Sequence, residues 1–156
     1  MVIAKVHGQF TQWSGTLELD TLNLAASKVE VKLEAASVDT RDGPRDVHLR
    51  SADFFDVAKH PYLEFRSTRV EQAGAKKYKV YGALTIRGVK REIVLDTVFG
   101  GQGKAPWGGP RVRFEATTKV DRKEFGLQWN TALEAGGLLV GDTIDVAIEI
   151  EAKKAT

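Results

Sequence analysis

Residues 28–37 read KVEVKLEAAS, and this stretch decides the fold class. Apolar Val29, Val31, Leu33 and Ala35 alternate with charged Lys28, Glu30, Lys32 and Glu34. Because successive side chains of a β-strand point to opposite faces, one face of this segment is apolar and the other is charged. Such alternation is typical of a strand that buries one face and exposes the other to water.

The same period of two recurs along most of the chain on both sides of this segment. It occurs in residues 62–69, 78–87, 89–99, 111–120 and 142–152, and residues 6–20 read as an opening strand or a bent strand pair.

The segments between these strands carry turn, loop and helix signals. Arg87-Gly88 predicts a tight hairpin, and residues 72–75 predict a longer hairpin loop. Residues 100–110 contain five glycines and two prolines, which predict a loop. A short helix is expected within residues 42–55, with Pro44 in its first turn and Val47, Leu49, Arg50 and Phe54 on one amphipathic face.

Six or seven antiparallel strands joined by hairpins predict an all-β barrel or sandwich. Several of these strands have about ten residues, or roughly 33 Å, which favours a tall, extended antiparallel barrel over a sandwich. We therefore expect a single domain over residues 1–156, built as a β-barrel with one short helix. A narrow apolar interior of this kind suits a long, linear hydrophobic molecule.

The composition excludes several other classes of protein. The 156 residues are 42% hydrophobic and 28% charged, which is ordinary for a globular domain, and the net charge of +2 gives no reason to expect a nucleic-acid partner. There is no cysteine for a disulfide or a thiol nucleophile. No apolar run is long enough for a stable membrane insertion, and no secretory signal is visible, so the default expectation is a cytoplasmic protein. A periplasmic location is the alternative if the N-terminus is truncated.

No established catalytic motif is present, so no enzyme activity, catalytic residue or cofactor is predicted. His7, His48 and His60 are far apart in the sequence, and we predict no metal site from them.

Six short motifs resemble those of the YceI-like lipid-binding family, and they occur in the family's order. They are the VHGQFTQWSG opening at residues 6–15, DVHLRSADFFDV at 46–57, HPYLEF at 60–65, GALTIRGV at 82–89, RKEFG at 122–126 and VGD at 140–142. Trp13 stands where the family has a second Phe. The resemblance implies a lipocalin-like barrel that binds polyisoprenoids or related amphiphiles without catalysis. Family members usually carry one more N-terminal strand, and exposed strand edges without it predict a homodimer.

The predicted ligand-binding residues lie on the inward rows of the strands and beside the helix. They are Phe10, Leu33, Leu49, Phe54, Phe55, Phe65, Val80, Gly82, Leu84, Ile93, Leu95 and Phe114. The same residues could instead form the barrel's own core, and Phe54 and Phe55 could plug one end of it. Gly82 is expected to leave room for a ligand because it has no side chain.

Cations near the helix are candidates for binding a charged headgroup. They are Arg41, Arg45, His48 and Arg50, which could face a phosphate at the barrel mouth. The alternative is that they pair with the nearby Asp39, Asp42, Asp46 and Asp53. Arg87 and Arg91 are interpreted as solvated charges beside a turn.

The leading functional hypothesis is the binding of a long-chain isoprenoid or fatty-chain lipid in a hydrophobic interior, for carriage or sequestration. The alternative is a protein-interaction or stress-protection module whose interior is filled by its own side chains. The volume of the interior discriminates between these two hypotheses.

Overall fold

The computed structural model describes residues 8–20, 22–104, 110–127 and 143–153. The strands are β1 (Gln9–Phe10), β2 (Trp13–Glu18), β3 (Lys28–Glu34), β4 (Val38–Asp39), β5 (Tyr62–Gly74), β6 (Lys77–Ile86), β7 (Val89–Lys104), β8 (Pro110–Asp121) and β9 (Thr143–Lys153). The helices are α1 (Gly43–Arg50) and the short 3-10 helices η1 (Leu24–Ala26), η2 (Ala35–Ser37) and η3 (Arg122–Phe125). The VGD motif at residues 140–142 lies outside the described residues.

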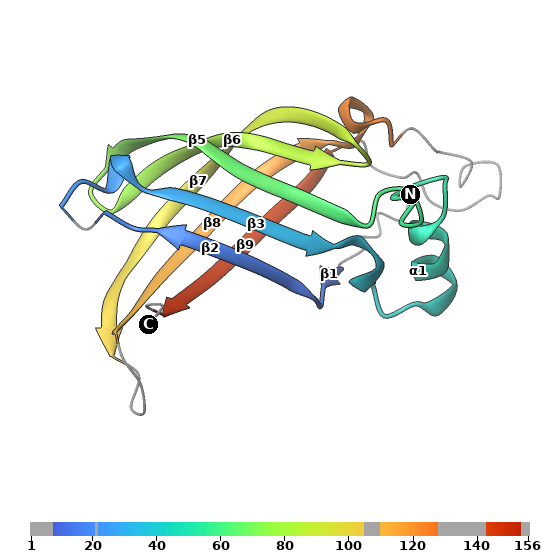
Figure 1. Ribbon diagram of the computed structural model, residues 1–156, viewed down its shortest axis with the longest axis horizontal. Helices are drawn as coiled ribbons and strands as arrows, with labels where there is room; N and C mark the ends of the chain where they lie inside the picture. Colours follow the sequence, from blue (N-terminus) through green and yellow to red (C-terminus); the bar gives the residue numbers. More distant parts are fainter. Residues whose placement is uncertain (1–7, 21, 105–109, 128–142, 154–156) are drawn as a thin grey trace, which may run out of the picture.

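Seven strands form one antiparallel sheet in the order β2-β3-β5-β6-β7-β8-β9. The sheet curls into a half-barrel in which β2 and β3 cross in front of β8 and β9 (Figure 1). The short strands β1 and β4 form a separate two-stranded pair. The prediction of an all-β, extended antiparallel barrel with one short helix is therefore confirmed in class, although the described strands close the barrel only halfway, with β2 and β9 as outer strands.

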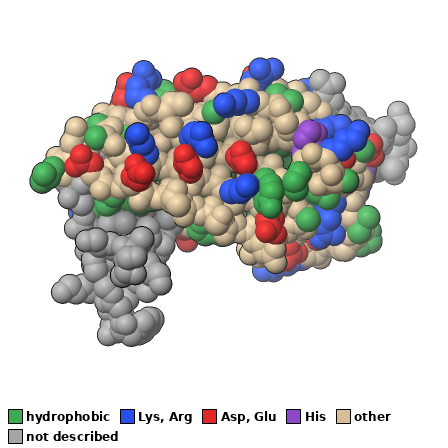
Figure 2. Space-filling model, in the orientation of Figure 1, with side chains coloured by type: hydrophobic (Ala, Val, Ile, Leu, Met, Phe, Trp, Pro, Cys, Tyr) green, Lys and Arg blue, Asp and Glu red, His purple; other side chains and the backbone are tan. Residues whose placement is uncertain are grey.

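The two faces of the sheet follow the alternation in the sequence. In β3 the apolar positions are half-buried and the charged ones are exposed, and in β5 Leu63 and Phe65 are buried between exposed neighbours. The outer face presents acidic and basic side chains interspersed with one another (Figure 2). Two ion pairs there cross the strands, Arg66 Nε to Glu30 Oε1 at 3.1 Å and Lys32 Nζ to Glu64 Oε1 at 3.8 Å.

Two hairpins show how turn geometry follows local sequence. Arg87 and Gly88 both have positive φ, 52° and 73°, as a two-residue turn between β6 and β7 requires, so this hairpin prediction is confirmed. The loop predicted at residues 72–75 is wrong. Strand β5 continues to Gly74, which pairs with Lys77, and the turn lies at Ala75 and Lys76.

The glycine-rich segment departs furthest from its predicted structure. Strand β7 continues to Lys104 and pairs with β8, so residues 100–104 are strand rather than loop. The register shifts between Phe99 and Gly101, and an added Cβ at Gly100 would lie 3.2 Å from the Cβ of Arg113. The long partner strand satisfies the backbone of these glycines, which outweighs their low strand propensity. Residues 105–109 lie outside the described residues.

Gly15 also differs from expectation, because β2 pairs with β3 without a bulge from Trp13 to Glu18. An added Cβ at Gly15 would lie 3.2 Å from the carbonyl oxygen of Glu30, so this glycine permits close approach to β3 instead of bending the strand.

Helix α1 and η3 lie at the same end of the half-barrel, which we call the helix end (Figure 1). The β2–β3 and β5–β6 connections lie at the opposite end, which we call the hairpin end (Figure 1).

Asp42 caps α1 by accepting a hydrogen bond of 3.1 Å from the Arg45 amide, and Pro44 lies in the first turn as predicted. The predicted apolar helix face is wrong at Val47, which is 65% exposed. Within the described ranges, no helix has the length and apolar character needed to cross a bilayer.

Candidate functional site

The concave side of the half-barrel holds a large apolar cavity of about 610 Å³. Its wall includes Leu19, Ser27 and Tyr78 at the hairpin end and Leu127 and Arg122 at the helix end, so the cavity follows the strands along their length. The row from Tyr78 to Ile86 on β6 spans roughly 26 Å at about 3.3 Å per residue. Volumes of this size are typical of small-molecule binding sites.

Most of the predicted ligand-binding residues line this cavity. They are Phe10, Leu33, Phe55, Phe65, Val80, Leu84, Ile93, Leu95 and Phe114. The strands β3, β5, β6, β7 and β8 contribute their inward-pointing rows, whereas Phe10 comes from β1 and Phe55 from the segment after α1. Phe10 contacts Phe55 edge-on, with ring centroids 5.7 Å apart, at the helix end of the wall.

Three of the predicted residues do not line the cavity. Phe54 is 8% exposed and belongs to the core beneath α1, and Leu49 packs against the same cluster. Gly82 is buried, but an added Cβ there would lie 2.5 Å from Cζ of Phe65 and 2.6 Å from the carbonyl oxygen of Arg66. The expectation that Gly82 leaves room for a ligand is therefore wrong, because the Phe65 ring occupies that space.

The wall also contains residues that sequence reasoning did not assign to the site. Trp13 and Leu17 come from the outer strand β2, and Ile144 and Val146 come from the opposite outer strand β9. Trp13 is 50% exposed and Ile144 is 42% exposed, so the two sides of the open sheet carry large apolar groups. The alternation in both segments was the signal that could have found them.

Arg122 is the most unusual residue of the cavity wall. It is 2% exposed, whereas the other charged residues on the wall, Lys28, Glu64, Asp145 and Glu149, are solvent-exposed. Its Nη1 donates to the carbonyl oxygen of Leu127, and the Leu127 amide returns a hydrogen bond of 3.1 Å to the Arg122 carbonyl. The turn of residues 122–127 therefore holds this guanidinium at the helix end of the cavity.

The cations predicted to bind a headgroup lie outside the wall of the apolar cavity. Arg45 donates from Nε to Thr40 Oγ1 and from Nη2 to the Thr40 carbonyl oxygen, both at 2.9 Å. Arg50 donates from Nε to the carbonyl oxygen of Ala36 at 2.9 Å. These two arginines tie α1 to the segment that precedes it.

The remaining two candidates lie near carboxylates. His48 Nε2 lies 2.9 Å from Asp53 Oδ2, and its ring contacts Phe54 edge-on. Arg41 is exposed and adopts a positive φ of 61°, with its amide donating to Asp39 Oδ1 at 2.9 Å. The structure thus places His48 beside Asp53, and Arg45 Nη1 lies 3.8 Å from Asp42 Oδ2; both aspartates are among those that the sequence offered as alternative partners.

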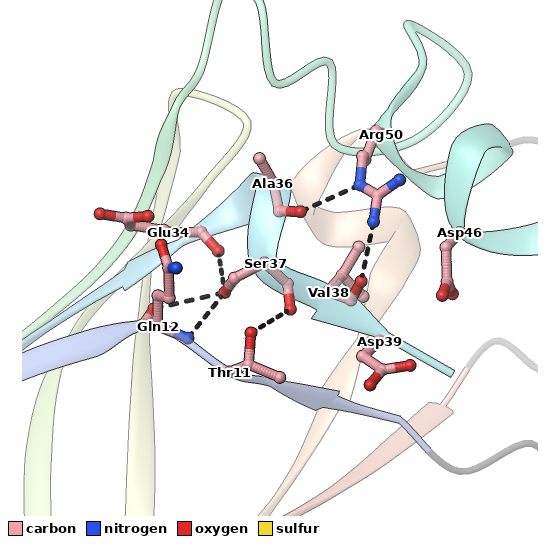
Figure 3. A pocket seen from close by; sticks show the side chains of 9 residues that line it. All are labelled: Thr11, Gln12, Glu34, Ala36, Ser37, Val38, Asp39, Asp46 and Arg50. Carbon is pink, nitrogen blue, oxygen red and sulfur yellow. Dashed lines mark hydrogen bonds between the residues drawn. The ribbon is translucent and has the colours of Figure 1, made fainter. Parts of the chain in front are cut away.

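A second, polar pocket of about 400 Å³ lies beside α1 (Figure 3). It is lined by Thr11, Gln12, Glu34, Ala36, Ser37, Val38, Asp39, Asp46 and Arg50. Ser37 Oγ donates to the Glu34 carbonyl oxygen at 2.7 Å and accepts from the Gln12 amide at 3.1 Å. These bonds run between the neighbouring segments of the chain, so we interpret this pocket as the junction between the sheet and the helix.

Asp46 stabilises that junction from within α1. It is 7% exposed, and its Oδ1 accepts hydrogen bonds from the Thr40 hydroxyl and from the Thr40 amide at 3.0 Å. The Thr40 hydroxyl hydrogen bond lowers the pKa of the Asp46 carboxyl below its usual value, and the charges of Arg50 and Arg45 lower it further against the opposing effect of burial.

Arg87 is half-buried and Arg91 is exposed beside the turn, and each side chain also lies near a backbone carbonyl oxygen. Arg87 Nη1 lies 3.5 Å from the carbonyl oxygen of Gly126, and Arg91 Nε donates to the carbonyl oxygen of Glu124 at 3.3 Å. Both contacts join the β6–β7 hairpin to η3 and the turn that carries Arg122.

The YceI-like domain model matches residues 1–152, which is almost the whole chain. The chain belongs to the YceI-like family. A UPF0312 protein of Pseudomonas savastanoi is 43% identical over 123 residues, which cover 79% of this chain. The matched region spans 64% of the length of that relative.

One solved structure supports the same family assignment, and a second shares the fold. The YceI protein of Campylobacter jejuni is 32% identical, with a TM-score of 0.87, covering 100% of this chain and 89% of that protein. A polyisoprenoid-binding domain from Saccharophagus degradans, implicated in plant cell wall breakdown, shares the fold at 15% identity with a TM-score of 0.65. That likeness covers 92% of this chain and 83% of the Saccharophagus domain. The resemblance expected from the sequence motifs is therefore confirmed.

Proposed function

We propose that this YceI-like chain binds a long-chain isoprenoid or related amphiphilic lipid in the apolar cavity, and that it carries or sequesters the lipid without changing it chemically. The observation that carries the proposal is the cavity itself, about 610 Å³ of space along a concave wall of Val, Leu, Ile and Phe side chains. A self-filled core, which the alternative hypothesis requires, would leave no such space.

The energetics favour a long hydrocarbon chain as the occupant. Each methylene group that leaves water for an apolar wall contributes about 0.8 kcal/mol, so a chain of many methylenes gains several times that amount. Part of the gain offsets the entropy lost when a flexible chain is ordered. An elongated cavity between β2 and β9 accommodates a linear molecule better than a compact one.

A solved domain with the same fold supports the same ligand class. The Saccharophagus degradans domain with this fold is described as polyisoprenoid-binding. We extend this ligand class to the present chain because its own cavity wall consists mainly of Val, Leu, Ile and Phe side chains.

Native purification followed by organic extraction and mass spectrometry tests the proposal. We expect a long-chain isoprenoid or fatty-chain lipid in near-stoichiometric amount. An unrelated protein of similar size, purified in parallel from the same cells, controls for lipid carried over from the membrane. Folded protein that yields no more lipid than this control, and that binds no added long-chain lipid, would contradict the proposal.

A further inference from the structure

We propose that the hairpin end of the half-barrel docks on an anionic lipid bilayer, with Leu22 among the lipid chains and Lys76 and Lys77 facing the headgroups. We call the surface formed by Leu22, Lys76, Lys77 and Val98 the docking surface. This inference rests on the proposed lipid-binding function, and it adds the end of the molecule at which lipid is exchanged with a membrane.

The first argument is the exposure of Leu22 in the β2–β3 connection. Leu22 is 98% exposed, compared with 65% for Val47. Local hydrogen bonds hold the backbone around it, because Asp20 Oδ1 accepts from the amides of Leu22 and Asn23, both at 3.0 Å. The Asp20 amide in turn donates to Ser27 Oγ at 3.0 Å. The turn is therefore held together by its polar groups while Leu22 stays in the solvent.

The second argument is the place of this connection beside the cavity. Leu19 and Ser27, which flank Leu22 in the sequence, both line the cavity wall. Lys28 also lines the wall and is exposed, so the cavity reaches the surface at this end. A single exposed leucine is common on protein surfaces. At the end of a lipid cavity it can anchor that end in a bilayer, so that a lipid chain passes into the cavity without contact with water.

The third argument is the charge beside Leu22. Lys76 lies in the turn between β5 and β6, Lys77 begins β6, and both are exposed. Helix η1 of the β2–β3 connection lies beside β5, so the two connections share the hairpin end (Figure 1). Lys77 pairs with Gly74 and with the 44% exposed Val98, which carry no charge. Among the residues that the structure describes, neither lysine forms an ion pair. Lysines of this kind are attracted to an anionic membrane surface.

The helix end has some of the same features but covers its end of the cavity. It carries the exposed Val47 and the exposed lysines Lys59 and Lys90. On the cavity wall at this end, however, Arg122 and Leu127 are only 2% and 3% exposed. The helix end therefore supplies matched control positions for the docking surface.

The orientation is tested with one fluorescent label at each end of the molecule. Because the chain has no cysteine, Leu22→Cys and Val47→Cys each provide a single position for a nitrobenzoxadiazole label. When vesicles of phosphatidylglycerol and phosphatidylcholine in equal parts are added, the label at position 22 should become brighter and shift to shorter wavelength. The label at position 47 should not change. An equal response of the two labels, or a response at position 47 alone, would overturn the proposal.

The role of the lysines is tested by sedimentation with the same vesicles. The wild type should bind them at least about tenfold more tightly than vesicles of phosphatidylcholine alone. Lys76→Asn combined with Lys77→Gln should weaken this binding about tenfold, and asparagine suits the positive φ of 59° at position 76. Lys59→Gln combined with Lys90→Gln, at the helix end, should leave the binding unchanged. An equal loss in both double variants would assign the binding to overall charge and overturn the docking surface.

Titration with the neutral apolar dye N-phenyl-1-naphthylamine, without vesicles, separates this inference from the proposed function. A wild type that binds the dye but not the anionic vesicles would overturn the docking surface while the lipid-binding function stands. Unchanged dye affinity in the Lys76 and Lys77 double variant, together with weaker vesicle binding, would support the docking surface. Vesicle binding without dye binding would overturn the proposed function and, with it, the exchange of lipid at this end.

Discussion

Gly82 shows how one residue shapes the wall of the cavity. It pairs with Ser67 on β5 and Ile93 on β7, and the Phe65 ring lies over the position where its side chain would be. A glycine at this register position lets the Phe65 ring lie against the sheet, and the cavity begins above the ring.

We predict that Gly82→Ala destabilises the protein by about 1–3 kcal/mol, because a new Cβ would overlap both a ring carbon and a backbone oxygen. Urea unfolding followed by circular dichroism measures this change. The matched control is Gly43→Ala at the start of α1, where no atom lies within 4 Å of the added Cβ and little or no loss is expected. Equal effects of the two substitutions would show that the contact with Phe65 is unimportant.

At this scale the sequence predicted inward-facing residues well and polar partners poorly. Alternation alone placed Leu33, Phe65 and Leu84 on the cavity wall, because a strand fixes the direction of each side chain. Which acceptors an arginine side chain finds depends on which backbone carbonyl oxygens the fold brings near it. Arg50 bonds to the backbone of Ala36 and Val38, fourteen and twelve positions away, which no local pattern encodes.

The connection between α1 and β4 shows how an element is held in place. Asp46 in the helix accepts two hydrogen bonds from Thr40 just after β4, and Arg45 donates two more to the same threonine. This arrangement fixes the helix beside the end of the cavity where Phe10 and Phe55 meet.

The lowered pKa of Asp46 makes the helix junction sensitive to acid. Its folded-state pKa is below the unfolded value of about 3.9, so its contribution to stability is complete above that value and is lost as pH falls through the folded-state pKa. We predict that Asp46→Asn lowers the melting temperature at neutral pH. We also predict a smaller difference between the melting temperatures at pH 7 and pH 3 for this variant than for the wild type. The exposed control Asp96→Asn should leave this difference unchanged, and an identical response of both variants would contradict the account.

Strands and turns could be predicted from the sequence where the local sequence signal and the strand pairing agree. The Arg87-Gly88 turn could be predicted because a residue pair ending in glycine stands between two alternating segments, which indicates a two-residue hairpin turn. The positive φ of both residues agrees with that turn. The end of β7 was missed because Gly100 and Gly101 indicate a loop locally, whereas pairing with β8 extends the strand to Lys104. The end of a strand depends on pairing with its partner as well as on its own composition.

The whole molecule is a curled sheet whose outer strands, β2 and β9, find no further strand in the described part of the chain. Such edges carry unpaired backbone donors and acceptors that can pair with another strand. The apolar residues Trp13 and Ile144 on these two strands increase the tendency to associate.

We therefore predict that the chain dimerises through these edges. Light scattering should show a mass that rises toward that of a dimer with increasing protein concentration. Over the same range, amide hydrogen exchange should slow in β2 and β9 and stay constant in the central strand β6. A strictly monomeric mass at high concentration would contradict this prediction.

The central claim is that a lipid chain occupies the interior of the half-barrel, and one titration tests it most directly. Leu84 lies on the cavity wall between two groups of buried residues, one that includes Leu63, Ile86 and Phe125 and one formed by Phe65, Val80, Leu95 and Ala116. Leu84→Trp should therefore obstruct the cavity while preserving the fold. The matched variant Lys79→Trp places the same indole on the outer face of the same strand.

The fluorescence of N-phenyl-1-naphthylamine is measured as the dye is titrated with the wild type, Leu84→Trp or Lys79→Trp, and each titration gives a dissociation constant. We predict saturable binding to the wild type and to Lys79→Trp, and an affinity at least about tenfold weaker, or about 1.4 kcal/mol, for folded Leu84→Trp. Equal affinity of all three proteins for the dye would place binding outside the cavity and contradict the account.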